Sequence, residues 1–318
     1  MKKTKAVNMD VDMDSFPDYL YYYTTIETLK KIVENRTLWL GDYRFMNDED
    51  ELLWSAKTIS DTFSRAEYQN EDGYDYKCSI DKINDIIKNI IAGNLHYAVN
   101  RYDPVSNDTY ASRQIANRTS RYVFCLSSNE DDKDMWAEYG KKELGCRIKF
   151  NTKGLNNYFM RVKQFNIKHY NPFLFCTKVN YEEFDLIAQA ITIRNRFWCG
   201  PEEPLTSERV VFNTLISHKN GYYHNENEYR IVCAYSDESE LYSSADNNSP
   251  SIKKVCQNCG TYIKPFIEID KLQVENVISE IMISPYNKSD LATIGMKDWI
   301  YHKTRKEIDI VTSGIKIR

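Results

Sequence analysis

Short apolar segments of strand character recur along this chain, and they constrain its fold more than any other feature. The clearest is residues 122–126, an aromatic and β-branched run that ends at Ser127 and Ser128. Helical stretches separate such segments without a regular strand–helix alternation. This pattern predicts an α+β fold with a mixed or antiparallel sheet. Further strands are predicted at residues 20–23, 38–40, 145–150, 231–235, 262–269, 278–284 and 308–311.

Amphipathic helices are predicted between several of these strands. One follows residues 20–23, where Thr24 with Glu27 three positions later matches a capping box. Apolar residues then recur at helical spacing to about Asn35. The same spacing predicts helices at residues 80–95, 184–198, 207–218 and 287–299.

The chain is predicted to form a single α+β domain over residues 1–318. Residues 1–18 have the polar composition of a loose lead. Residues of about 64–120 are predicted to be a helical insertion, because their apolar side chains would cover only one face of a helix.

Charge and hydrophobicity exclude some classes of partner. The formal net charge is -4 and the pI is about 5.9, so no bulk charge attracts the chain to nucleic acid or to an anionic membrane. No stretch approaches the roughly 20 apolar residues of a membrane span, and the basic N-terminus is not followed by an apolar core. We expect a cytoplasmic protein with no membrane partner.

The cysteines are predicted to be reduced thiols. There are 8, and no export signal accompanies them. Cys256 and Cys259 form a lone Cys-x-x-Cys, whereas a structural zinc site needs a second pair of ligands, and the 5 histidines show no paired spacing. We therefore expect a turn with two thiols and no metal site.

The segment Glu226-Asn227-Glu228-Tyr229-Arg230 is the strongest candidate for chemistry. Residues two apart on an extended chain face the same side, so both carboxylates would point in one direction. Two interpretations stay open: Glu228 and Arg230 could form an ordinary surface ion pair, which contributes little to stability, or the glutamates could be catalytic acids.

Four motifs occur in an order that resembles the bacterial domain-of-unknown-function family 2971. The first is Tyr21-Tyr22-Tyr23-Thr24-Thr25, and the second is residues 45–51, where Glu49 replaces the family's proline. The third comprises Ser127, Met135, Trp136, Tyr139 and Gly145. The last is residues 226–230, followed by a strand at residues 280–283.

The order of elements is also similar to the ADP-ribosyltransferase fold. This resemblance implies an ADP-ribosyltransferase-like core in which Tyr21 or Tyr23, Ser127 and Glu228 surround the nicotinamide half of NAD. Glu228 would stabilise the positive charge that develops on the ribose, and Glu226 would orient or deprotonate the incoming nucleophile. The other residues implied in NAD binding are Thr24, Asn47, Trp136, Tyr139 and Arg230.

The resemblance implies an enzyme that consumes NAD as its substrate and transfers ADP-ribose to an intracellular macromolecule, either a protein or a nucleic acid. Related transferases often serve as toxins or anti-phage effectors, so an antitoxin or a defence-system partner is also implied. Two alternatives stay open: an NAD glycohydrolase that uses water as acceptor, and a non-catalytic nucleotide- or protein-binding regulator.

Overall fold

The computed structural model describes residue 13 and residues 15–46, 51–64, 77–93, 100–103, 108–111, 119–166, 174–198, 204–236 and 250–316. Its strands are β1 (Tyr19–Thr25), β2 (Leu38–Asp42), β3 (Asn100–Asp103), β4 (Asp108–Ala111), β5 (Thr119–Ser127), β6 (Gly145–Asn151), β7 (Leu174–Lys178), β8 (Glu228–Ser236), β9 (Ile252–Asn258), β10 (Ile263–Ile269), β11 (Ile278–Ile283) and β12 (Asp309–Thr312). Its α-helices are α1 (Ile26–Asn35), α2 (Glu51–Ser64), α3 (Lys77–Ile91), α4 (Lys133–Tyr139), α5 (Thr152–Asn166), α6 (Glu183–Trp198), α7 (Pro204–Ile216), α8 (Val274–Val277) and α9 (Asp290–Thr304).

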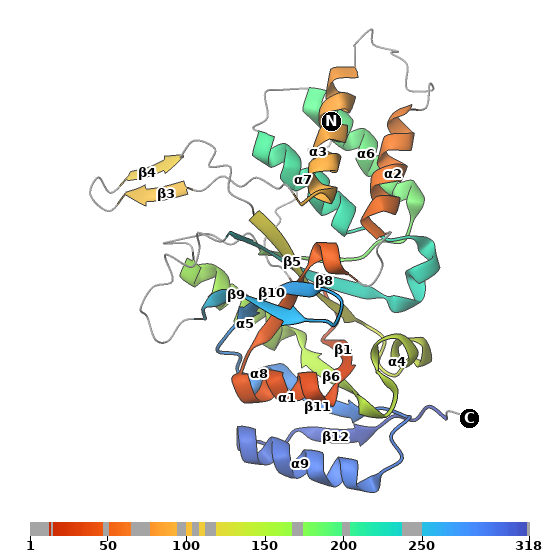
Figure 1. The fold of residues 1–318 in the computed structure, drawn as a ribbon, viewed down its shortest axis with the longest axis vertical. Helices are drawn as coiled ribbons and strands as arrows, with labels where there is room; N and C mark the ends of the chain where they lie inside the picture. Colours follow the sequence, from red (N-terminus) through yellow and green to blue (C-terminus); the bar gives the residue numbers. More distant parts are fainter. Residues whose placement is uncertain are drawn as a thin grey trace.

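Within the described residues, one mixed sheet of ten strands forms the centre of the molecule (Figure 1). Its order is β12-β11-β6-β1-β5-β2-β10-β9, with β8 on the other edge of β5 and β7 beyond β8. Every pairing in this sheet is antiparallel except that of β11 with β12. The prediction of an α+β fold with a mixed, mostly antiparallel sheet is confirmed.

Strand β5 pairs with three other strands, β8 on one edge and both β1 and β2 on the other. Strand β8 pairs with β5 along its whole length, from Thr119 to Ser127. On the opposite edge, β1 pairs only with the end of β5, at Tyr21 and Ser127, while β2 pairs with its earlier part. Because β1 and β2 share one edge of β5 but continue to different neighbours, the sheet is split between them.

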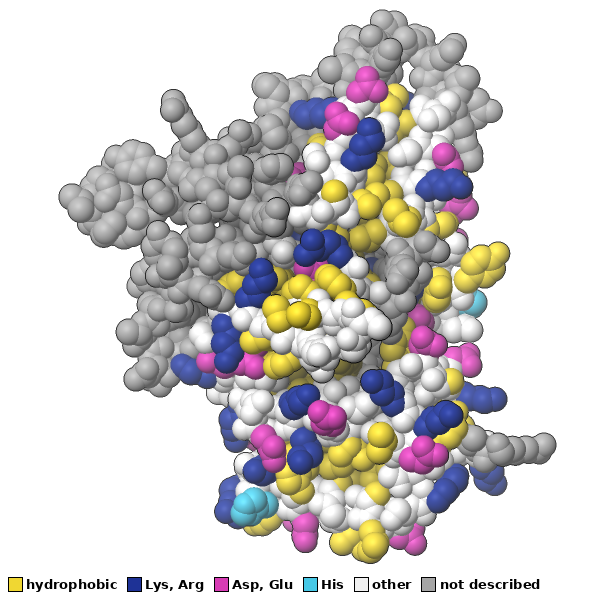
Figure 2. All heavy atoms as spheres, viewed as in Figure 1, with side chains coloured by type: hydrophobic (Ala, Val, Ile, Leu, Met, Phe, Trp, Pro, Cys, Tyr) yellow, Lys and Arg dark blue, Asp and Glu magenta, His cyan; other side chains and the backbone are white. Residues whose placement is uncertain are grey.

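Helices cover both faces of the sheet. On one face, α1 and α5 contribute side chains such as Leu29 and Tyr158 to the largest apolar cluster. On the other face, α2, α3, α6 and α7 form a layer over β5 and β8, which Figure 1 shows at the top of the molecule. Helix α4 covers the β1 side of that same face through Met135 and Trp136. Within the described residues, no helix is both long and apolar enough to cross a lipid bilayer. On the face drawn in Figure 2, Lys and Arg side chains are interspersed with Asp and Glu side chains over the lower half of the molecule.

The cap of α1 differs from the sequence prediction, and the predicted insertion and lead both contain described residues. Thr25, not Thr24, caps α1: its hydroxyl accepts a hydrogen bond from the backbone N–H of Thr28 at 3.1 Å. The predicted insertion contains α3 and also the hairpin of β3 and β4, and α3 packs against α6 and α7 as part of the common helical layer. In the predicted lead, Met13 is buried and Phe16 packs on Tyr229 with ring centroids 4.8 Å apart.

Gly145, at the start of β6, is expected to tolerate no side chain. A Cβ atom there would overlap the carbonyl oxygen of Gly140, which is backbone and cannot rotate away. Gly145→Ala is expected to lower the free energy of unfolding by about 1–3 kcal/mol, the usual cost of overpacking. Gly295→Ala is the control, because a Cβ at that position in α9 meets nothing and should add about 0.5–1 kcal/mol. Urea unfolding of both variants tests this, and equal effects would contradict it.

Candidate functional site

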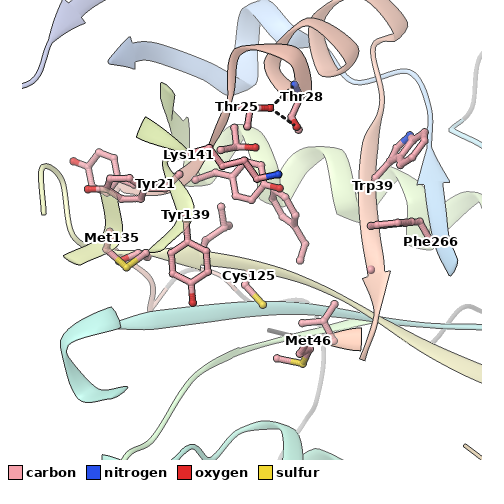
Figure 3. Close-up of a pocket in the computed structure, with 18 of the residues that line it drawn as sticks. Tyr21, Thr25, Thr28, Trp39, Met46, Cys125, Met135, Tyr139, Lys141 and Phe266 are labelled. Carbon is pink, nitrogen blue, oxygen red and sulfur yellow. Dashed lines mark hydrogen bonds between the residues drawn. The ribbon is translucent and has the colours of Figure 1, made fainter. Parts of the chain in front are cut away.

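A cavity of about 820 Å³ lies where β1 and β2 diverge. Its walls come from β1, the first turns of α1, β2, β5, α4 and β10, and several of these side chains are shown in Figure 3. This volume is within the range of small-molecule sites, roughly 300–1,000 Å³. The cavity is therefore large enough for a cofactor-sized ligand.

Three residues predicted from distant parts of the sequence line this cavity on adjacent strands. Tyr21 on β1 lies opposite Ser127 on β5, and Ser127 lies opposite Glu228 on β8. Directly opposed residues of antiparallel strands point to the same face of a sheet. Tyr23, two positions after Tyr21, therefore faces the same side and also lines the cavity.

Glu228 is a buried carboxylate that Arg230 holds in place. Nε and Nη2 of Arg230 donate to Oε1 and Oε2 of Glu228 at 2.8 and 2.7 Å, and Nη1 donates to the carbonyl oxygen of Ile216 at 2.7 Å. Glu228 is 6% exposed and Arg230 is 0% exposed. This pair is buried, so the surface ion pair considered from the sequence does not describe it.

The same contacts keep Glu228 ionised. Burial by itself would raise the pKa of the Glu228 carboxyl, but the charge and hydrogen bonds of Arg230, with a further contribution from Lys219, lower that pKa below its usual value. The phenol of Tyr181 also accepts a hydrogen bond from the Glu228 backbone N–H at 3.0 Å. The chain thus places a fixed negative charge at the cavity wall.

Glu226 ends the 3-10 helix Gly221–Glu226, not the extended strand expected from the sequence, and it shares Lys219 with Glu228. The ammonium of Lys219 is 2.7 Å from Oε2 of Glu226 and 3.7 Å from Oε2 of Glu228. The hydroxyl of Tyr139 donates to Oε1 of Glu226 at 3.0 Å. Burial and the two carboxylates raise the pKa of Tyr139, so its phenol stays protonated and remains a donor. Glu226 is only half-buried and therefore closer to solvent than Glu228.

The hydroxyl groups of Ser127 and Tyr23 both stabilise the turn after β5. Ser127 Oγ donates to the carbonyl oxygen of Glu226 at 2.6 Å and accepts from the N–H of Asn129 at 3.0 Å. The Tyr23 hydroxyl donates to the carbonyl oxygen of Asn129 and accepts from the N–H of Asp132, each at 3.0 Å. Ser127 in particular ties the end of β5 to the carbonyl group of Glu226, two residues before β8 begins.

The remaining predicted site residues are not all at the cavity surface. Thr24 and Tyr139 line it. Trp136 is completely buried, packs edge-on against Tyr23 and donates to Asp131, so its indole has no free face for a ligand. Arg230 lies behind Glu228 with its guanidinium on protein atoms, which leaves it a supporting role rather than contact with phosphate or ribose. Asn47 lies outside the described residues.

Sequence analysis did not single out several residues that form the cavity wall. They are Trp39 and Gly41 on β2, Cys125 on β5, Lys141 and Lys219 in connecting segments, and Lys264 and Phe266 on β10. Trp39 and Gly41 face one side because they alternate along a strand, but nothing local relates them to residues 264–266. Only the pairing of β2 with β10 brings these positions together.

The Cys-x-x-Cys segment leads into the hairpin turn between β9 and β10, and of its two cysteines Cys259 belongs to that turn: its N–H donates to the carbonyl oxygen of Tyr262 at 2.9 Å. Cys256 lies within β9, while Cys259 follows the end of that strand, and both are exposed free thiols. Among the residues that the structure describes, no group of three or more His, Cys, Asp or Glu side chains is placed to hold a metal ion.

Comparison with known proteins finds a family model that matches part of this chain. Residues 135–231 match the model of DUF2971, a protein family of unknown function. The match runs from α4 to the start of β8, so it includes Tyr139, Glu226 and Glu228 but covers less than half of the chain. It supports the resemblance to DUF2971 inferred from the sequence motifs. No curated protein and no solved structure matches this chain.

Proposed function

We propose that this protein is an NAD-consuming enzyme of ADP-ribosyltransferase type and that Glu228 acts on the nicotinamide–ribose bond. The observation that supports this most directly is the row of Tyr21, Ser127 and Glu228 across three adjacent strands, all lining one cavity. Those are the positions that the resemblance to ADP-ribosyltransferases implies. Tyr21 and Ser127 are more than 100 residues apart in the sequence, and so are Ser127 and Glu228.

The proposed chemistry uses the charge of Glu228. When the glycosidic bond breaks, nicotinamide leaves with the bonding electron pair, and positive charge develops on C1′ and the ring oxygen of the ribose. A preorganised carboxylate in a site with little water stabilises such charge more than it does in bulk solvent. Arg230 keeps Glu228 ionised and fixed from behind.

Glu226 is proposed to serve the acceptor. A nucleophile that adds to C1′ must lose a proton, and Glu226 is the more exposed carboxylate beside Glu228. Lys219 and Tyr139 hold its two oxygens, which orients it toward the same cavity. The reaction converts NAD and a protonated acceptor into an ADP-ribosylated acceptor, nicotinamide and a proton.

One observation favours a second candidate, a non-catalytic protein that binds a nucleotide. Both carboxylate oxygens of Glu228 already accept hydrogen bonds from Arg230, which reduces what they offer to a ribose. An NAD glycohydrolase, with water as the acceptor, is the third candidate and needs the same cleft.

A single assay separates these functions. The purified protein is incubated with NAD carrying a label on its adenosine half, with and without cell lysate, and free nicotinamide and labelled macromolecules are measured. Nicotinamide release with labelling of protein or nucleic acid supports the transferase, and release without labelling indicates the glycohydrolase. If NAD is neither bound nor consumed in the presence of lysate, the enzyme proposal is wrong.

Glu226→Gln is expected to reduce transfer more than hydrolysis. An amide cannot take a proton, and general-base catalysis is typically worth about 10²–10⁴-fold in rate. The ratio of labelled acceptor to free nicotinamide should therefore fall at least about tenfold below that of the wild type. Glu143→Gln removes an exposed carboxylate that does not line the cavity and serves as control. An unchanged ratio in Glu226→Gln would show that Glu226 does not activate the acceptor.

A further inference from the structure

The end of the cavity remote from Glu228 has an aromatic wall. The rings of Trp39 and Phe266 both line the cavity, with centroids 5.5 Å apart and planes inclined by 47°. Trp39 Nε1 donates to Oε2 of Glu268 at 2.7 Å, which fixes the indole. Figure 3 shows this pair on the side of the cavity opposite Met135 and Tyr139. Both rings are half-buried, so each retains surface for a ligand.

Gly41 makes room in front of this wall. It lies opposite Phe266 in the pairing of β2 with β10. A Cβ atom at Gly41 would approach Cε of Lys264 to 3.2 Å and Cε1 of Phe266 to 3.5 Å. A larger side chain at this position would therefore fill the space between β2 and the two β10 side chains.

Lys264 brings a positive charge to the same end. Its ammonium donates to the carbonyl oxygen of Phe45 at 2.6 Å and lies 5.4 Å from the centre of the Phe266 ring. The described part of the chain provides no carboxylate in ion-pair contact with this ammonium. Burial lowers the pKa of Lys264, although Cys259, Cys125 and Asp42 act in the opposite direction, so an anion beside the ammonium would favour its charged form.

The middle of the cavity is also suited to an anion. Lys30 and Lys141 line it, together with Thr25 and Thr28 of the first turn of α1. In the view of Figure 3, Lys141, Thr25 and Thr28 lie between the aromatic pair and Tyr139. The dipole of α1 and the lysine side chains favour an anion here, although the N–H of Thr28 is already bonded to Thr25. Glu27 in the same turn also lines the cavity and forms an ion pair with Lys31 at 3.0 Å.

We propose that this end of the cavity binds a nucleoside diphosphate, the ADP half of a dinucleotide, with its base on Trp39 and Phe266 and its phosphates near Lys264 and Lys141. Bases stack on aromatic side chains, and phosphates bind ammonium groups. The aromatic pair at the end of the cavity, followed by the lysines, therefore matches the base of such a ligand followed by its phosphates. The identity of the other half, nicotinamide and its ribose at Glu228, rests on the proposed function. Binding of ADP itself does not require catalysis.

Calorimetric titration with ADP, adenosine and inorganic pyrophosphate tests this site. The wild type should bind ADP, and pyrophosphate should compete with it because both use the lysines. Trp39→Ala should weaken ADP binding about tenfold or more through loss of stacking. Gly41→Val should weaken it comparably by filling the space for the base, and it needs no strained backbone because Gly41 has no positive φ.

Trp299→Ala is the matched control for Trp39→Ala. Trp299 is also a half-buried indole that donates to a glutamate, Glu34 at 3.3 Å, but it lies on α9 and does not line the cavity. The Trp299→Ala variant should bind ADP as the wild type does. Circular dichroism of each variant reports whether it is folded, and Gly41→Val provides the test if Trp39→Ala does not fold.

These outcomes distinguish a failure of the proposed ADP site from a failure of the enzyme proposal. If ADP fails to bind at millimolar concentration, or if folded Trp39→Ala and Gly41→Val bind it as the wild type does, the inference is overturned even where NAD is cleaved. If ADP does not compete with pyrophosphate, the assignment of the phosphates is overturned. If ADP binds and both variants weaken it while no nicotinamide is released from NAD, the nucleotide site stands and the enzyme proposal fails.

Discussion

Replacing Glu228 by glutamine is expected to reduce NAD cleavage about 100- to 1,000-fold, the usual effect of removing one preorganised electrostatic group from an active site. The amide has nearly the same shape but no negative charge, so it would not stabilise the positive charge on the ribose. NAD binding should change little, because the aromatic and basic walls at the other end of the cavity are untouched. The rate of nicotinamide release and the affinity for NAD, measured on the same preparation, test this.

The control must separate lost chemistry from lost stability. Glu280→Gln also breaks a glutamate–arginine pair on the sheet, with the completely buried Arg147, but Glu280 does not line the cavity. Each substitution should lower the free energy of unfolding, and only Glu228→Gln should lower the rate per folded molecule. Equal loss of rate in the two variants would show that Glu228 acts through stability alone.

Replacing Arg230 by methionine is expected to lower the free energy of unfolding by about 3–5 kcal/mol, the typical effect of removing one partner from a buried ion pair. Glu228 would be left as a buried carboxylate without its principal partner, and the carbonyl of Ile216 would lose a donor. Arg36→Met is the control, since the pair of Arg36 with Glu275 is solvent-accessible and should contribute less than about 1 kcal/mol. Urea unfolding at neutral pH measures both.

The difference between wild type and Arg230→Met is expected to shrink in acid. In the folded wild type the pKa of Glu228 lies below the usual glutamate value of 4.5, so Glu228 contributes stability that is fully present above pH 4.5 and is lost as the pH falls through the folded pKa. Without Arg230, burial would raise the pKa of Glu228, and protonation would then stabilise the variant instead. The unfolding free energies of the two proteins should therefore converge as the pH falls from neutral to below 4.5, where the wild type begins to lose the contribution of Glu228. Parallel curves would show that Arg230 does not control the ionisation of Glu228.

Predictions from local sequence were most accurate for single helices and strands whose hydrophobic pattern is evident within the element itself. The run at residues 122–126 lies in β5, and the helical spacing after Thr25 forms α1 with Leu29, Ile32 and Val33 buried. Thr25 rather than Thr24 caps α1 because β1 continues through Thr25, which pairs with Gly145 of β6. The apolar side chains of residues of about 64–120 predict a helix with one covered face, but the sequence does not show that α6 and α7 pack against that face.

The candidate site shows the same limit more clearly. Alternation along the chain by itself determined that Tyr21 and Tyr23 share a face, because side-chain direction in a strand has a period of two residues. It did not place Glu226, which ends the 3-10 helix Gly221–Glu226 and is joined to β8 through Asn227 in the left-handed region, so its position relative to Glu228 depends on that turn. Only the tertiary structure decided that Arg230 is a buried partner of Glu228, that Trp136 lies behind the cavity, and that Trp39 and Phe266 share a wall. The physical reason is that these contacts depend on which strands pair and in which register, and both are set by packing between segments far apart in the sequence.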